Sequence, residues 1–99
     1  MFFINIIDSY REVVAVCDSD MVGKVFEQGK FQLDVKESFY KGKQVSEKEL
    51  FDMINHLSRE DAIFNIVGKN SVNVALKEGI ILEEGIRKIQ GIPFALVLL

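Results

Sequence analysis

A glycine followed by a lysine, an asparagine and a serine forms the stretch of this chain whose residue types and position best suit ligand chemistry. The apolar run 63–67 before it predicts a strand, and the amphipathic segment 72–78 after it, closed by Gly79, predicts a helix. Free backbone N–H groups at the N-terminus of a helix favour an anion. The predicted anion site comprises Gly68, Lys69, Asn70 and Ser71, with Lys24, Lys41 and Lys43 in neighbouring loops.

The pair Gly68-Lys69 resembles part of the phosphate loop of nucleoside triphosphatases, but the full signature is missing. That signature requires a glycine five residues before Gly68, where Ile63 stands, and a serine or threonine after the lysine, where Asn70 stands. A nucleoside triphosphatase is therefore excluded on this motif. The turn also has a purely structural interpretation, in which Asn70 or Ser71 caps the helix and Lys69 is solvated.

Lysines and two adjacent aromatic residues offer a second possible binding surface. The members of this possible basic patch are Lys24, Lys30, Lys36, Lys41, Lys43 and Lys69, with Phe39 and Tyr40. Such a combination suits single-stranded nucleic acid, because bases stack on aromatic rings and cations track the phosphates. The formal net charge of −3 argues against a broad nucleic-acid surface and favours solvated lysines with part-buried aromatics.

The chain has one cysteine and one histidine, which limits both metal binding and catalysis. Cys17 closes an apolar strand before a possible helix N-terminus, a place that can activate a thiol, although a free cysteine is more often buried and inert. His56 stands four residues after Asp52, the spacing of a surface pair on a helix. No nucleophile, base and oxyanion donor come together in the pattern, so we expect a non-enzymatic protein without metal or cofactor.

Length and composition indicate one domain spanning residues 1–99, with 48% hydrophobic and 27% charged residues. No apolar run approaches the length of about 18 residues that a membrane-spanning helix needs. The N-terminus has neither the basic segment nor the long apolar segment of a signal peptide. We therefore expect a cytoplasmic protein that does not insert into a membrane.

The N-terminal half predicts a β-hairpin followed by a helix and a strand. Residues 2–8 and 13–17 are the hairpin strands, and the unbroken apolar character of the second predicts burial on both faces. Asp18-Ser19 predicts the N-cap of a helix with an apolar face that Gly29 ends. Residues 31–35 alternate as a half-buried strand does, and 39–43 are expected to form a loop.

The C-terminal half predicts two further helices and two further strands. Ser46 and Glu49 form a capping box, flanked by Val45 and Leu50 at the hydrophobic-staple positions. Besides the strand–turn–helix unit at 63–79, short strands are expected at 86–89 and at 94–99, the last of them buried. The predicted fold class is α/β (or α+β): a single domain with an N-terminal β-hairpin, a mixed sheet and about three short helices.

Several short patterns occur together in a fixed order along the chain. They are Val16-Cys17-Asp18, Val22-Gly23-Lys24-x-Phe26-x-x-Gly29, Phe39-Tyr40-x-Gly42, Asn65-Ile66-Val67-Gly68, Ala75-Leu76-x-x-Gly79 and Gly91-Ile92-Pro93. Each is weak alone, but their joint order resembles, over essentially the whole chain, a small archaeal family of uncharacterised proteins, domain-of-unknown-function family four-two-four. Members of that family tend to carry a histidine after the late proline, where this chain has Phe94.

The resemblance implies an archaeal cytoplasmic protein and no catalytic residues, because the family has no established activity. An association of the family with translation genes implies RNA or a translation component as partner, and RNA phosphate as the anion at the predicted site. The alternative is a protein–protein interaction domain, or a homo-oligomer formed through an apolar sheet edge. A small enzyme is the least favoured of the three classes.

Overall fold

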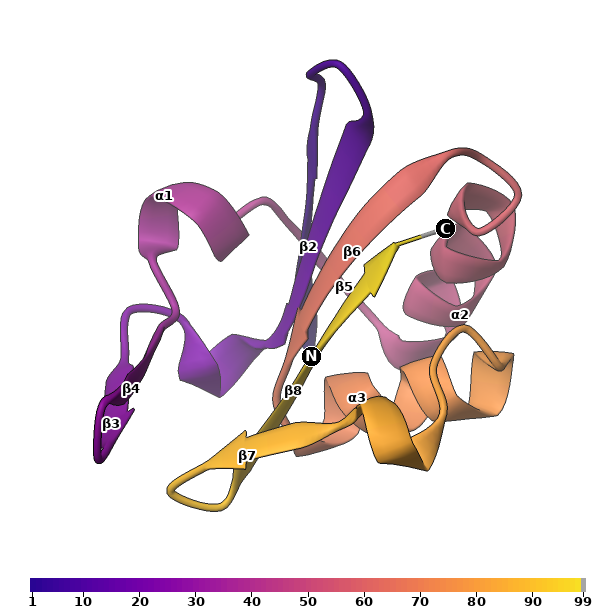
Figure 1. Cartoon of the computed structure of the whole chain (residues 1–99). Helices are drawn as coiled ribbons and strands as arrows, with labels where there is room; N and C mark the ends of the chain where they lie inside the picture. The colour runs from indigo at the N-terminus through magenta and orange to yellow at the C-terminus, as the bar shows by residue number, and fades with distance from the viewer. Residues whose placement is uncertain (99) are drawn as a thin grey trace.

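A six-stranded mixed sheet organises the fold, and the computed structural model describes residues 1–98 (Figure 1). The strand order is β5-β1-β2-β6-β8-β7, and β3 and β4 form a separate two-stranded sheet. The strands are β1 (Phe2–Ile7), β2 (Glu12–Asp18), β3 (Val25–Gln28), β4 (Phe31–Asp34), β5 (Lys43–Val45), β6 (Ala62–Val67), β7 (Arg87–Ile89) and β8 (Ile92–Leu98). The helices are α1 (Glu37–Tyr40), α2 (Glu47–Leu57) and α3 (Lys69–Glu78), with 3₁₀ turns η1 (Ser19–Met21) and η2 (Glu83–Gly85).

The two central strands of the sheet, β2 and β6, run parallel, and every other pair in the sheet is antiparallel. The expected N-terminal hairpin is confirmed as β1 and β2. The expected burial of the second strand on both faces is confirmed as well, because residues 14–17 are all fully buried. The fold is the single mixed α+β domain that the sequence predicts.

The sheet separates two apolar layers (Figure 1). Since successive side chains of a strand point to opposite faces, Val14 and Val16 pack toward α2 and α3. Ala15 and Cys17 pack toward the other layer, which contains Tyr40 of α1 and the β3–β4 hairpin. This second layer covers only part of its face of the sheet, because the hairpin and α1 are short.

The helix expected after Asp18 is wrong. The chain makes the single 3₁₀ turn η1 and then forms β3, which pairs with β4 through a two-residue turn at Gly29-Lys30. Gly23 and Gly29 adopt positive φ angles of 83° and 61°, a backbone that a helix does not allow. Gly29 therefore closes a hairpin instead of ending a helix.

The turn or loop expected at 39–43 is confined to residues 41 and 42, because the expected segment also contains the end of α1 and the start of β5. Gly42 lies directly against the backbone of β1, where a Cβ would be 2.8 Å from the Cα of Asn5. Only glycine lets the chain run this close to β1, and the contact precedes β5 as it joins the sheet edge. Tyr40 is buried and Phe39 is half-buried, so the two aromatics pack in the core instead of presenting faces to a ligand.

The C-terminal strand lies between β6 and β7, inside the sheet as expected, but it is buried on one face only. Ala95 and Val97 face the helices and are buried, whereas Leu96 and Leu98 are 62% and 65% exposed. The second apolar layer does not reach them. Leu99, which the expected strand included, lies outside the described residues.

The capping box of α2 is confirmed. The Ser46 hydroxyl accepts a hydrogen bond of 3.2 Å from the backbone N–H of Glu49, and the Glu49 carboxylate accepts one of 3.1 Å from the backbone N–H of Ser46. These bonds hold the pKa of Glu49 below its ordinary value. Val45 and Leu50, at the staple positions, are both fully buried.

We expect Ser46→Ala to lower the free energy of unfolding by about 1 kcal/mol, because an N-terminal N–H group of α2 loses its acceptor. Denaturant unfolding measures the change. Ser38→Ala is the matched control, since Ser38 is an exposed serine of α1. Equal unfolding midpoints for Ser46→Ala and the wild type would contradict a stabilising cap.

Candidate functional site

The N-terminus of α3 is capped by a carboxylate from a distant part of the chain. One oxygen of Asp18 accepts hydrogen bonds from the backbone N–H and side-chain amide of Asn70, at 3.1 and 3.2 Å. The other oxygen accepts bonds of 2.7 Å from both the backbone N–H and the hydroxyl of Ser71. Asp18 is 6% exposed and Ser71 is fully buried, so this cap is an interior feature of the fold.

Gly68 makes the close approach of this carboxylate possible. Its φ angle is 109°, and a Cβ at this position would lie 2.5 Å from the carboxyl carbon of Asp18. Its own N–H donates a 2.9 Å hydrogen bond to the carbonyl of Pro93 in β8. A side chain at position 68 would therefore be strained by its backbone and would collide with Asp18.

These contacts correct the predicted anion site. The backbone N–H groups of Asn70 and Ser71 already bind Asp18, and its negative charge would repel a second anion at the same place. The capping residue is neither Asn70 nor Ser71, since both act as donors to Asp18. Only the side chain of Lys69, which is exposed, keeps a possible role in binding.

The other lysines of the predicted site are not brought to this turn. Lys43 lies on β5 at one edge of the sheet, and Lys41 pairs with the Glu37 carboxylate at 3.3 Å. Strands β1 and β2 separate β5 from β6, which at about 4.8 Å per strand amounts to about 14 Å. Lys24 precedes β3 in the separate two-stranded sheet, so the predicted constellation does not assemble.

The structure gives Cys17 and His56 no shared chemistry. Cys17 is fully buried, and desolvation, followed by the charges of Asp18 and Asp20, raises the pKa of its thiol to about 12. His56 is exposed on α2, which covers the opposite face of the sheet. Within residues 1–98, no group of three or more histidine, cysteine or acidic side chains could hold a metal ion, and no helix is long and apolar enough to span a membrane.

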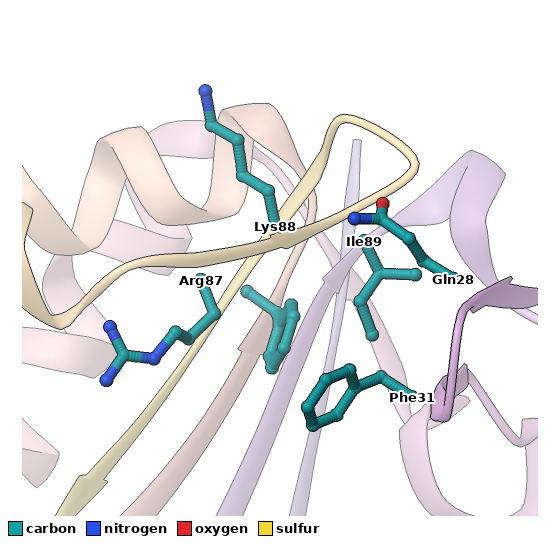
Figure 2. A pocket seen from close by; sticks show the side chains of 6 residues that line it. Gln28, Phe31, Arg87, Lys88 and Ile89 are labelled. Atoms are coloured by element: carbon teal, nitrogen blue, oxygen red, sulfur yellow. The ribbon is translucent and has the colours of Figure 1, made fainter.

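A groove that the sequence patterns did not reveal lies between the β3–β4 hairpin and β7 (Figure 2). It has a volume of about 390 Å³ and is lined by Gln28, Phe31, Arg87, Lys88, Ile89 and Phe94. Phe31 is 72% exposed, an unusual position for a phenylalanine ring. In Figure 2 the side chain of Ile89 points toward the ring of Phe31, so the groove combines an apolar floor with an open aromatic wall.

Hydrogen bonds between the end of β3 and the β7–β8 turn fix the width of this groove. The side-chain oxygen of Gln28 accepts a 2.8 Å bond from the backbone N–H of Gln90, and the Gln90 side chain donates a 2.7 Å bond to the Glu27 carbonyl. Gln90 lies in the β7–β8 turn, where its φ angle is 52° and that of Gly91 is 77°. The hairpin is thus tied to the edge of the main sheet.

Arg87 and Lys88 present positive charge on opposite sides of β7. Lys88 lines the rim of the groove, and Figure 2 shows its side chain extending from β7 in the opposite direction to that of Arg87. On the side of β7 opposite Arg87, Lys88 lines a depression of about 320 Å³ together with Lys69 and Asn73. Of the ion pairs formed within residues 1–98, none involves Lys69, Arg87 or Lys88, so their charges are available to a ligand.

The sequence carried a weak signal for this site. The pair Arg87-Lys88 falls in a short expected strand, where alternation places adjacent side chains on opposite faces. Phe31 begins an alternating strand, but nothing local distinguishes an exposed phenylalanine from a core one. Its exposure depends on where the hairpin docks, which is a tertiary property.

Comparison with known proteins places the chain in a family. One family model matches residues 7–99, nearly the whole chain. The chain belongs to the family described as protein of unknown function, DUF424. No protein of curated function matches it.

The fold of this DUF424 protein is also seen in a crystal structure of an uncharacterized conserved protein from Methanopyrus kandleri. The two superpose with a TM-score of 0.84 over 98% of this chain and 91% of the other, at 23% sequence identity. That match shows a shared fold.

We expect Asp18→Ala to destabilise this DUF424 protein by about 2 kcal/mol, because buried donors at Asn70 and Ser71 lose their acceptor. Chemical denaturation measures the change. Asp20→Ala is the control, since Asp20 is an exposed acidic residue two positions later. A loss for Asp18→Ala no greater than that for Asp20→Ala would refute the cap.

Alkaline pH should destabilise the protein through its second apolar layer. Burial raises the pKa of Cys17 and of Tyr40 to about 12 from ordinary values of 9.0 and 10.0. Because these folded-state values are raised, their contribution to stability is present below the ordinary pKa and is lost as the pH rises toward 12. The unfolding midpoint of the wild type should fall between neutral pH and pH values above the ordinary thiol pKa, and Cys17→Ala should make this fall smaller. A fall of the same size in Cys17→Ala would count against a buried neutral thiol.

Proposed function

We propose that this DUF424 protein is a small, non-enzymatic RNA-binding module of the archaeal cytoplasm, and that the groove between the β3–β4 hairpin and β7 receives a base of single-stranded RNA. One observation carries the proposal: the exposed ring of Phe31 lines the same groove as the guanidinium of Arg87, which forms no ion pair within residues 1–98. Both groups stack on bases, which makes them the recurring elements of single-strand recognition.

The groove is suited to a flat, partly apolar ligand. Ile89 and Phe94 line it beside Phe31, and the docked turn of Gln90 holds its walls in place without a ligand. A fixed groove binds with a smaller entropic cost than a flexible one. A base inserted here would cover the Phe31 ring, which is 72% exposed.

The backbone of the RNA would follow the positive charges around β7. Arg87 lies in the groove, and Lys88 with Lys69 lies on the other side of the same strand. Lys69 of the predicted anion site, whose exposed side chain takes no part in the Asp18 cap, thereby joins the proposed surface. Because the net charge of the chain is −3, the attraction is local and binding should weaken steeply with salt.

Nothing in the described residues favours catalysis over binding. The buried thiol of Cys17 holds its proton, and the exposed imidazole of His56 lies on the other side of the sheet. Lys69 and Lys88 line an open depression without a nucleophile beside them. A binding role needs only the groove and its charges.

The expected result is measurable binding of a labelled single-stranded oligouridine of about 12 nucleotides at low salt, by fluorescence anisotropy. Lys88→Ala and Lys69→Ala should each lower the slope of log affinity against log salt by about 0.7, the value for one lost phosphate contact on a single strand. Lys48→Ala is the control, since Lys48 is an exposed lysine of α2 outside the groove.

Phe31→Ala should weaken the same binding by about 10-fold with little change in the salt slope, because a lost stack is not an electrostatic contact. Phe31→Tyr should keep the affinity. Absence of binding by the wild type at low salt would refute the proposal and favour a protein partner. Binding that Phe31→Ala leaves unchanged would place the site outside the groove.

A further inference from the structure

One edge of strand β8 is paired with β7 over only about half of its length. Strand β7 pairs with residues 92–94 of β8, and the register ends where Arg87 meets Phe94. Residues 95–98 pair with β6 on one side alone. On the other side, the structure of residues 1–98 shows no backbone partner for them.

The direction of the unpaired groups follows from the alternation of a strand. The carbonyl of Pro93 accepts from Gly68, at the end of β6, so the backbone groups of Pro93 and of every second residue after it face β6. The N–H and C=O groups of Leu96 and Leu98 therefore point out of the sheet. Their side chains are exposed as well, so the same two residues present both hydrogen-bonding groups and apolar surface.

The free part of the edge opens into a groove with a second apolar wall. This groove has a volume of about 370 Å³ and runs between residues 95–98 of β8 and the segment 80–85. Ile80, Ile81 and Leu82 line its far side, and Leu82 is itself exposed. An extended strand fits such a site, because it can satisfy the backbone groups of β8 and cover the leucines at once.

The composition of this edge argues for pairing with an identical strand. Residues 95–98 contain no charged residue and no proline, whereas sheet edges that stay unpaired usually carry one or the other. The opposite edge of the sheet follows that rule, since β5 is three residues long and carries Lys43. Two copies of β8 can meet through residues 95–98 without bringing any charged side chain into the contact.

We propose that two copies of this chain associate by antiparallel pairing of residues 96–98 of β8 about a two-fold axis, joining their sheets into one. The outward-facing groups of Leu96 in one copy bind those of Leu98 in the other, and the reverse pair repeats the bonds. Val97 then lies opposite Val97 of the second copy on the axis. The arrangement is isologous and closes, so it gives dimers and not fibres.

The apolar face of the sheet continues across such a dimer. Ile7, Val13, Ile63 and Leu98 stand side by side in one row across four strands. Pairing adds Leu96 of the second copy to the end of this row. The exposed leucines of both copies thereby cover one another instead of facing water.

Sedimentation equilibrium over micromolar to millimolar chain concentrations tests the proposal. The wild type should show a reversible dimer, and Leu96→Lys should be monomeric throughout, because two lysines would face the apolar pair. Val25→Lys, an exposed strand residue of the other sheet, should behave as the wild type does. A wild type that stays monomeric, or a Leu96→Lys protein that dimerises like it, would overturn the proposal.

Cysteine cross-linking tests the register independently of affinity. Facing residues of a non-hydrogen-bonded antiparallel pair have Cα atoms about 4.5 Å apart, within the range of a disulfide. Val97→Cys should therefore form a disulfide-linked dimer under mild oxidation, while native Cys17 stays reduced because it is buried. Val25→Cys, an exposed position on the separate two-stranded sheet, controls for random collisions. Cross-linking of Val25→Cys equal to that of Val97→Cys would refute the two-fold pairing.

Discussion

The buried carboxylate of Asp18 is the contact on which the centre of the fold depends. It stands at the end of β2 and accepts four hydrogen bonds from the first turn of α3. Strand β6 leads into that turn beside β2, in parallel, so the cap fixes where the strand ends and the helix begins. Gly68, which leaves room for the carboxylate, also binds Pro93 of β8 through its N–H. The ends of β2, β6 and β8 and the start of α3 are therefore held together around the buried Asp18 carboxylate.

This cap moves the candidate function away from the place where the sequence pattern favours it. A helix N-terminus that opens after a strand is a common anion site, but here the protein supplies its own anion. Ligand chemistry is left to side chains at the sheet edge, where Phe31, Arg87 and Lys88 lie beside Lys69. Their arrangement depends on the docking of Gln90 against Gln28, a contact between residues 62 positions apart.

Local patterns predicted the elements whose signals are local. The Ser46–Glu49 box, the turn at Gly68 and the left-handed cap at Gly79 each involve residues within one or two turns, and each is found. The segment after Asp18 was misassigned because its apolar spacing suits a helix as well as a strand; pairing with β4 decides it. The cap by Asp18 and the groove at Phe31 join distant residues, which a single sequence does not connect.

The two proposed surfaces lie on the same edge of the sheet without overlapping. Strand β7 lines the groove proposed for RNA and covers residues 92–94 of β8, while the proposed pairing uses residues 96–98. In a two-fold dimer centred on Val97, Phe94 lies three residues from the axis, about 10 Å along the strand. The two grooves are then about 20 Å apart along the shared sheet. A single RNA strand that reaches both grooves would bind more tightly than one that reaches a single groove, because the two sites are linked. Pairing through β8 would therefore favour RNA binding, in addition to covering the exposed leucines.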